Sequence, residues 1–91
     1  MEQRVLTINH GKKKIISKPW DFEAMCLVDD EKRKGKAGTL RSGAEAVYYL
    51  FEGTEATEEV LKKLNPSALG KLCMQVYRWY TSDLTEALKN G

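Results

Sequence analysis

The residues best able to do chemistry in this chain are one histidine and two cysteines, and their spacing keeps them apart. His10 lies in the segment Asn9-His10-Gly11, whose residue types are typical of a tight turn. Cys26 and Cys73 lie inside helical apolar patterns, where free cysteines behave as small hydrophobic residues. They form no C-x-x-C pair and have no histidine neighbour in the sequence, so we expect neither a zinc site nor a cysteine nucleophile. A disulfide between them is the alternative that two cysteines leave open.

Acidic residues offer one further candidate site. The run Asp29-Asp30-Glu31 could bind a hard cation, but it lacks alternating ligands and a following glycine at loop spacing, so we expect a solvated helix end. General acid–base chemistry needs two groups whose environments separate their pKa values, and no such pair is recognisable. The sequence therefore predicts no enzyme, with no catalytic residue, no cofactor and no metal.

Basic residues make nucleic acid the alternative partner. Lys12-Lys13-Lys14 and the loop Lys32-Arg33-Lys34-Gly35-Lys36 could lie together and neutralise phosphates. Against this interpretation, the net charge is only +2 and no aromatic residues alternate with the bases as a stacking platform requires. The segment 58–63, which would be the recognition helix of a helix-turn-helix, begins with two glutamates that would meet phosphates badly. We therefore keep nucleic-acid binding as an alternative.

The charge is unevenly distributed along the chain. Residues 1–42 carry ten Lys and Arg against six Asp and Glu, a net charge of +4, whereas residues 43–91 carry five against seven, a net charge of −2. A head-to-tail contact between two copies would bring opposite signs together, which favours encounter more than affinity. A solvated surface that is simply asymmetric explains the same numbers.

The elements that position these residues form one small domain covering residues 1–91. With 42% hydrophobic and 31% charged residues, the composition is that of an ordinary globular protein. The longest apolar run, at about 46–51, is too short to cross a bilayer, and the first residues lack the apolar core of a signal peptide. We therefore expect no membrane association and, from the two unpaired cysteines, a reducing cytoplasmic location.

Residues 3–18 predict a β-hairpin. Two strand-length segments rich in β-branched residues, Arg4–Asn9 and Lys13–Lys18, are joined by the turn at Asn9-His10-Gly11. Pro19 then ends the second strand, because it has no N–H to donate. A lone hairpin is marginal in water, so it must pack on the helices or on a second copy of the chain.

Helical patterns fill the rest of the chain, which gives an α+β fold with the hairpin packed on about four helices. We place the helices at 22–31, 40–52, 57–64 and 66–89. The expected N-caps are Asp21, Thr39, Thr57 and Asn65. The first helix is apolar on most sides, from Phe22 onward, which predicts that it is covered on two faces.

The last helix contains an acidic residue inside its long apolar arc. The arc runs from Leu69 to Leu88 at helical spacing, and Asp83 falls within it. We favour a break or bend near Thr81–Asp83, because Thr, Ser and Asp side chains compete with helical backbone bonds. Alternatively, Asp83 faces a polar partner.

Aromatic residues are more numerous than one small core requires, which points to protein–protein contacts. We expect Tyr77 and Tyr80 in the core, and Trp79 and Tyr49 at an interface. The hypothesis is a binding surface formed by the outer strip of the 40–52 helix and the edge of the last helix. Its residues are Tyr49, Leu50, Trp79, Leu84 and Leu88.

Several motifs resemble those of phage tail assembly chaperones. Val5-Leu6-Thr7-Ile8-Asn9-His10-Gly11-Lys12 resembles their x-I-x-I-N-G-K hairpin opening, with His10 inserted before the glycine. Trp20-Asp21-Phe22-Glu23-Ala24 resembles their aromatic-Asp-Phe-x-Ala helix start, and Leu50-Phe51, Thr57-Glu58-Glu59 and a closing amphipathic helix continue the likeness. It covers nearly the whole chain. The basic loop 32–36 and the aromatic last helix depart from it.

The resemblance implies a protein of a long-tailed phage or a prophage, working in the cytoplasm of the bacterial host cell. Members of this family coat the aggregation-prone tape-measure protein, help to recruit tail-tube protein, and are absent from the finished tail. The expected partners are therefore the tape-measure protein, the tail-tube protein and further copies in a homo-oligomer. The alternatives are a small nucleic-acid-binding phage protein, or another structural tail or neck component.

Overall fold

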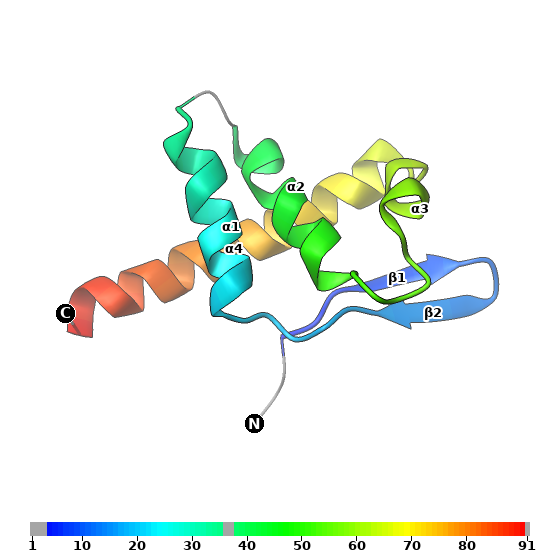
Figure 1. Ribbon diagram of the computed structural model, residues 1–91, viewed down its shortest axis with the longest axis horizontal. Helices are drawn as coiled ribbons and strands as arrows, with labels where there is room; N and C mark the ends of the chain where they lie inside the picture. Colours follow the sequence, from blue (N-terminus) through cyan, green and yellow to red (C-terminus); the bar gives the residue numbers. More distant parts are fainter. Residues whose placement is uncertain (1–3, 36–37, 91) are drawn as a thin grey trace.

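The computed structural model describes residues 4–35 and 38–90 and confirms the predicted α+β class (Figure 1). A two-stranded antiparallel hairpin precedes the helices. The elements are β1 (Thr7–His10), β2 (Lys13–Ile16), α1 (Phe22–Arg33), α2 (Thr39–Leu50), α3 (Glu58–Lys62) and α4 (Pro66–Asn90). No helix in these two ranges combines the length and hydrophobicity needed to cross a membrane.

The hairpin turn lies later in the chain than expected. His10 is the last residue of β1 and pairs with Lys13, so Asn9 and His10 belong to the strand and the turn is Gly11-Lys12. Gly11 has a φ of 64°, as the first central position of a type II′ turn requires. A two-residue loop matches the twist of the two strands, and this is why it replaces the longer predicted turn.

Backbone bonds tie the hairpin to the helices. The strands are shorter than predicted, but Trp20 N–H still donates to the Arg4 carbonyl at 2.8 Å, so the two chain segments stay side by side up to α1. Lys18 N–H donates to the Leu50 carbonyl, also at 2.8 Å, at the end of α2. The hairpin is thus held by its own helices, as its marginal intrinsic stability requires.

Three of the four predicted helix caps are present. The Asp21 carboxylate accepts from Ala24 N–H at 2.9 Å, Thr57 Oγ1 accepts from Val60 N–H at 3.4 Å, and Asn65 Oδ1 accepts from Ser67 N–H at 2.8 Å. Each is a local signal, because the side chain bonds to a backbone group two or three residues ahead.

The predicted cap at Thr39 is wrong. Thr39 is already the first residue of α2, and the N-cap is Gly38, whose backbone is extended and which has no side chain to accept a bond. Glycine is an acceptable N-cap residue, so the helix starts one residue earlier than the sequence indicates.

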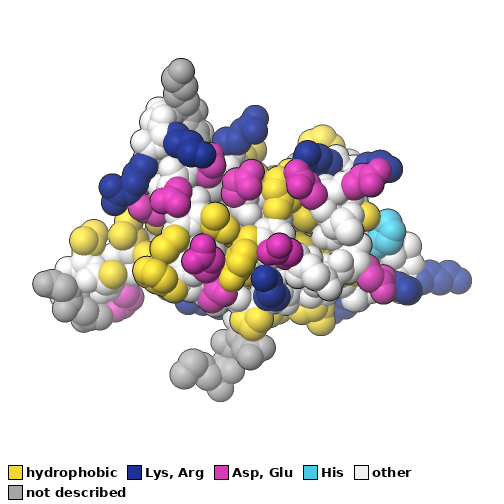
Figure 2. All heavy atoms as spheres, in the orientation of Figure 1, with side chains coloured by type: hydrophobic (Ala, Val, Ile, Leu, Met, Phe, Trp, Pro, Cys, Tyr) yellow, Lys and Arg dark blue, Asp and Glu magenta, His cyan; other side chains and the backbone are white. Residues whose placement is uncertain are grey.

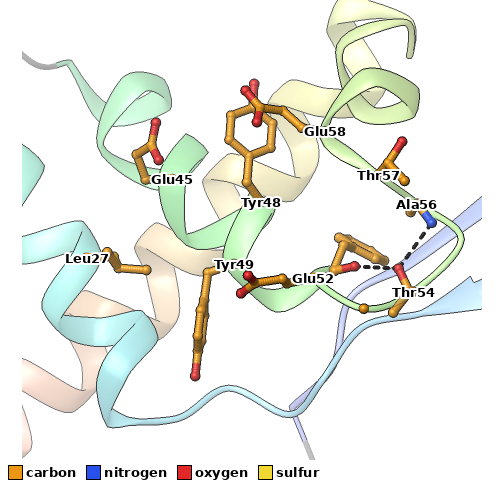
Figure 3. Close-up of a pocket in the computed structure, with 11 residues that line it drawn as sticks. Leu27, Glu45, Tyr48, Tyr49, Glu52, Thr54, Ala56, Thr57 and Glu58 are labelled. Atoms are coloured by element: carbon orange, nitrogen blue, oxygen red, sulfur yellow. Dashed lines mark hydrogen bonds between the residues drawn. The ribbon is translucent and has the colours of Figure 1, made fainter.

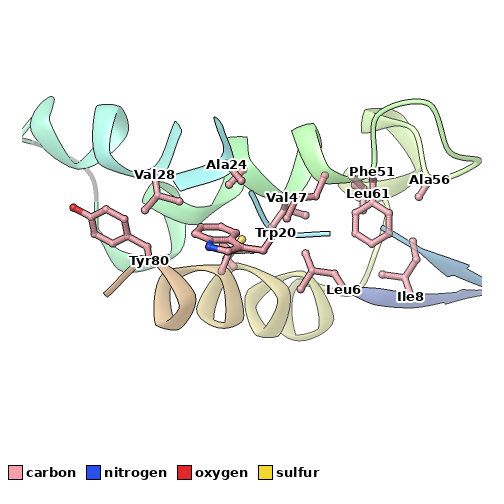
Figure 4. Packing of buried hydrophobic residues seen from close by; sticks show 14 of the residues in the cluster. Leu6, Ile8, Trp20, Ala24, Val28, Val47, Phe51, Ala56, Leu61 and Tyr80 are labelled. Carbon is pink, nitrogen blue, oxygen red and sulfur yellow. The ribbon is translucent and has the colours of Figure 1, made fainter. Parts of the chain in front are cut away.

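The core lies where α2 packs against both α1 and α4. In Figure 4, Phe51 and Leu61 lie beside Ile8 at the hairpin end, and Val28 and Tyr80 lie at the other end. The α2–α4 contact is very close at Gly43, because a Cβ atom there would lie 2.6 Å from the Cys73 carbonyl oxygen. The buried hydrophobic residues are Leu6, Ile8, Ile15, Trp20, Ala24, Val28, Ala46, Val47, Leu50, Phe51, Ala56, Leu61, Cys73, Val76 and Tyr80.

Helix α4 is continuous, so the predicted break near Thr81–Asp83 is wrong. The Thr81 hydroxyl donates to the Arg78 carbonyl at 3.0 Å and the Thr85 hydroxyl to the Thr81 carbonyl at 2.8 Å. These hydroxyls bond to the preceding turn and therefore do not compete for a different backbone path. Asp83 faces polar partners, which is the alternative that the sequence left open.

One further expectation fails. Phe22 was expected to be covered by other elements, but its side chain is 76% exposed, because only the face of α1 that carries Ala24 and Val28 meets the core.

Cys26 and Cys73 are both free thiols, so the alternative of a disulfide is excluded. Burial raises the pKa of the Cys73 thiol and, together with neighbouring carboxylates, that of Cys26, which disfavours the reactive thiolate.

Candidate protein-binding surface

Asp83 is the polar anchor that joins the N-terminal segment to α4. Its carboxylate accepts two bonds from the Arg4 guanidinium, both at 3.0 Å, and a third from Trp20 Nε1 at 2.8 Å. Burial raises the pKa of Asp83, but the bonds from Arg4 and Trp20 outweigh burial and leave the pKa below its ordinary value. A charged residue inside the apolar arc is therefore satisfied by partners that precede α1.

Asp29 makes a second polar link, between α1 and α4. It accepts from the Tyr80 hydroxyl at 2.7 Å and from Arg33 Nε at 2.6 Å, and the bond from Arg33 is the main cause that lowers its pKa. Burial and the hydrogen bond to Asp29 raise the pKa of Tyr80 to about 12. Asp29, the first residue of the acidic run that could bind a cation, is thus engaged in a structural contact. Among residues 4–35 and 38–90, no three His, Cys, Asp or Glu side chains converge as a metal site.

Trp79 lies at the edge of the core. Its ring packs on the buried Trp20 ring with centroids 5.6 Å apart, and its side chain is partly exposed. Trp79 precedes Leu88 by nine positions, which at about 100° per residue puts the two on opposite sides of α4. Trp79 and Leu88 therefore do not share one face.

Leu50 cannot belong to an exposed surface, which corrects the predicted site. Its side chain is fully buried, because α2 is covered by α1 on one side and α4 on the other, so the expected outer strip does not exist. Tyr49 is partly exposed, and its hydroxyl donates to Asp21 at 2.7 Å while Lys18 Nζ lies 3.9 Å from its ring centroid. The bond to Asp21 raises the pKa of Tyr49 to about 12.

Leu84 and Leu88 share the apolar side of the last turns of α4, which project beyond the other helices (Figure 1). Leu84 is partly buried and Leu88 is 75% exposed. Figure 2 shows hydrophobic side chains on this projecting end and over the start of α1, and α1 contacts α4. We call Phe22, Met25, Leu84 and Leu88 the apolar end face. Apolar side chains gathered at one end of a molecule, with Phe22 and Leu88 exposed, are typical of an interaction site.

The apolar end face includes residues that the sequence reasoning missed. Phe22 and Met25 were assigned to the covered faces of α1. The sequence did contain a signal that Phe22 lies off the buried face of α1. The buried residues Ala24 and Val28 are related by i, i+4 spacing, and Phe22 does not share this spacing.

A groove that the sequence did not predict lies between α1, α2 and α3 (Figure 3). It has a volume of about 380 Å³, and we call it the acidic groove. The turn after α2 closes one end, where the Thr54 hydroxyl donates to the Phe51 carbonyl at 2.6 Å. Its apolar walls and its charged rim come from four separate segments, so no single sequence motif could announce it. The walls include Leu27, Tyr48 and Tyr49, and the rim carries Glu45, Glu52 and Glu58.

The two basic runs do not lie together, so the predicted shared patch for phosphates is absent. The hairpin turn with Lys12–Lys14 and the end of α1 lie at opposite ends of the molecule (Figure 1). At the end of α1, Arg33 and Lys34 each form an ion pair with an acidic residue of the same helix. Lys36 lies outside the described residues.

Comparison of the chain with protein-family models, with curated proteins and with solved structures found no match.

Proposed function

We propose that this chain is a tail assembly chaperone of a long-tailed phage or a prophage, and that it holds apolar helical segments of the tape-measure protein in the cytoplasm of the bacterial host. The observation that carries the proposal is the apolar end face. It adds to the motif likeness a surface on which such a client could bind. Help in recruiting tail-tube protein and self-association belong to the same proposal.

The apolar end face suits a long, helix-rich client. Phe22 and Leu88 expose about three quarters of their side chains, so binding a client would remove large apolar areas from water. An amphipathic client helix presents apolar residues at i, i+3, i+4 and i+7, which match a face built from two helices. Each contact is small, but many copies bound along one client gain avidity.

The competing function has less support. The two basic runs are separate, and each contains residues engaged in ion pairs, so they give a weaker electrostatic footprint for nucleic acid than a single patch would. A salt-sensitive mobility shift with DNA or RNA would favour that alternative. Recovery of the chain from finished phage particles would favour a structural tail or neck component.

Suppression of aggregation tests the proposal directly. The tape-measure protein encoded in the same genome is diluted from denaturant with or without the chain, and light scattering is recorded. The wild type should keep the client soluble, whereas the Phe22→Gln/Leu88→Gln variant should need about tenfold more protein. Both replaced side chains are exposed, so the free energy of unfolding should change by about 0.5 kcal/mol or less.

Leu40→Gln is the matched control, because Leu40 is also an exposed leucine, 51% accessible, at the start of α2. It should suppress aggregation as the wild type does. Equal activity of all three proteins, or failure of the wild type to protect the client, would contradict the proposal.

A further inference from the structure

The acidic groove and the hairpin turn carry opposite charges on separate exposed surfaces. Glu58 forms an ion pair with Lys62 at 2.9 Å, whereas the side chains of Glu45 and Glu52 form no hydrogen bond or ion pair with any described residue. Figure 2 shows Asp and Glu side chains across the middle of the face that holds α2 and α3. Two carboxylates beside apolar walls remain available to a cationic ligand.

The hairpin turn projects from the molecule and carries basic side chains. The hairpin extends beyond the helices, and its tip is coloured as basic in Figure 2. Lys13 is held by its own chain, at 3.4 Å from Glu55. Lys12 and Lys14 are exposed, and neither has an ion-pair or hydrogen-bond partner in the part of the chain that the structure describes.

We propose that the acidic groove of one copy binds the hairpin turn of a second copy. The Lys12 and Lys14 ammonium groups would lie against Glu45 and Glu52. The aliphatic stems of the two lysines would cover Tyr48, since lysine buries its methylene groups while its charge stays at the polar rim. The Tyr48 ring adds a cation–π attraction for the lysine ammonium groups. A volume of about 380 Å³ is enough for these side chains.

A second copy is a better occupant than an unrelated basic peptide, because one chain carries both complementary surfaces. The hairpin cannot reach its own groove, since Ile8 and Ile15 are buried and fix it to the core. The uneven charge, +4 in residues 1–42 and −2 in residues 43–91, matches such a contact. Turn and groove are different surfaces, so the contact is heterologous and leaves one of each free to bind a further copy.

Charge reversal tests the proposal without any client. Sedimentation velocity at low and at physiological salt would compare the wild type with a groove variant, Glu45→Lys/Glu52→Lys, and a turn variant, Lys12→Glu/Lys14→Glu. The wild type should self-associate more at low salt, because exposed charges are screened by ions. Each variant alone should associate about tenfold more weakly or worse, since like charges then meet at the contact.

The equal mixture of the two variants is the decisive sample. The lysines of the reversed groove face the glutamates of the reversed turn, and the native groove of one variant faces the native turn of the other, so association should return. Asp30→Lys/Glu59→Lys reverses two exposed carboxylates outside the groove and should behave as the wild type. Circular dichroism of each protein checks its fold.

A second groove variant guards against misfolding. Glu45→Gln/Glu52→Gln keeps the side-chain size and should weaken association in the same direction, by less than the reversal. Phe22→Gln/Leu88→Gln should leave self-association unchanged, which separates this proposal from the client-binding one. A wild type that stays monomeric at both salt concentrations, variants that associate normally, or a mixture that fails to associate would overturn the proposal.

Discussion

Two stretches of α4, residues 73–80 and residues 84–88, carry the same apolar spacing but have different surroundings. Cys73, Val76 and Tyr80 are buried against α2 and α1, and Gly43 allows the backbones of α2 and α4 to meet. Beyond Asp83 the same period continues through Leu84 and Leu88, but the other helices end, so Leu84 is only partly buried and Leu88 is exposed. Periodicity therefore identifies the face of a helix, and the length of its neighbours decides whether that face is core or binding surface.

Truncating a leucine in each setting should give the largest contrast. Leu50→Ala should lower the free energy of unfolding by about 2–5 kcal/mol, because it leaves a cavity in a fully buried site. Leu88→Ala should change it by about 0.5 kcal/mol or less, since Leu88 is mostly exposed. Urea unfolding followed by circular dichroism measures both. Similar costs for the two variants would show that the end of α4 is packed in solution.

Adding one methyl group tests the close α2–α4 contact. Gly43→Ala should destabilise the fold by about 1–3 kcal/mol, because its Cβ would lie 2.6 Å from a backbone oxygen that cannot yield easily. Gly70→Ala is the matched control within α4, where the new Cβ would meet only Leu40 at 3.9 Å. Alanine there should stabilise the helix by about 0.5–1 kcal/mol. A neutral Gly43→Ala variant would mean that the two helices can separate at little cost.

Removing the charge of Asp83 should have a smaller effect that depends on pH. Asp83→Asn loses the bonds that need a carboxylate and should cost about 1–2 kcal/mol at neutral pH, discounted because Arg4 and Asp83 are partly exposed. The folded state lowers the pKa of Asp83, so the stabilisation is complete above the ordinary value of 3.8 and is lost as the pH falls through the lower, folded value. The variant should therefore lose less stability in acid than the wild type.

Thermal unfolding between neutral pH and strong acid would measure this difference. Asp30→Asn is the control, because Asp30 is exposed on α1. An unchanged acid dependence in Asp83→Asn would show that the link between Arg4, Trp20 and α4 does not hold in solution. The lowered pKa values of Asp21 and Asp29 would still make the stability fall in acid.

Local signals explain which features the sequence could predict. The caps at Asp21, Thr57 and Asn65 depend on groups two or three residues away, so they can be recognised without a fold. The partners of Asp83 could not be recognised in this way, because Arg4 lies 79 positions earlier in the chain. The burial of Leu50 likewise depends on two helices that cover α2 from different sides, information that no single helical pattern contains.

Tyr49 and Leu50 are neighbours in α2, but Leu50 is buried in the core, whereas Tyr49 is partly exposed. Replacing Tyr49 should have the smallest effect of the substitutions. Tyr49→Phe removes the hydroxyl that donates to Asp21 but keeps the ring beneath Lys18, so the midpoint of thermal unfolding should fall by less than in Asp83→Asn. The folded state raises the pKa of Tyr49 from 10.0 to about 12, so the bond stabilises the protein below pH 10 and is lost as the pH rises through 12.

Near-ultraviolet titration of tyrosinate measures this change. In Tyr49→Phe, one phenol fewer should titrate at about pH 12, and the phenol of Tyr80 should remain. If Tyr49→Phe leaves the titration near pH 12 unchanged, the hydrogen bond between Tyr49 on α2 and Asp21 at the start of α1 does not hold in solution.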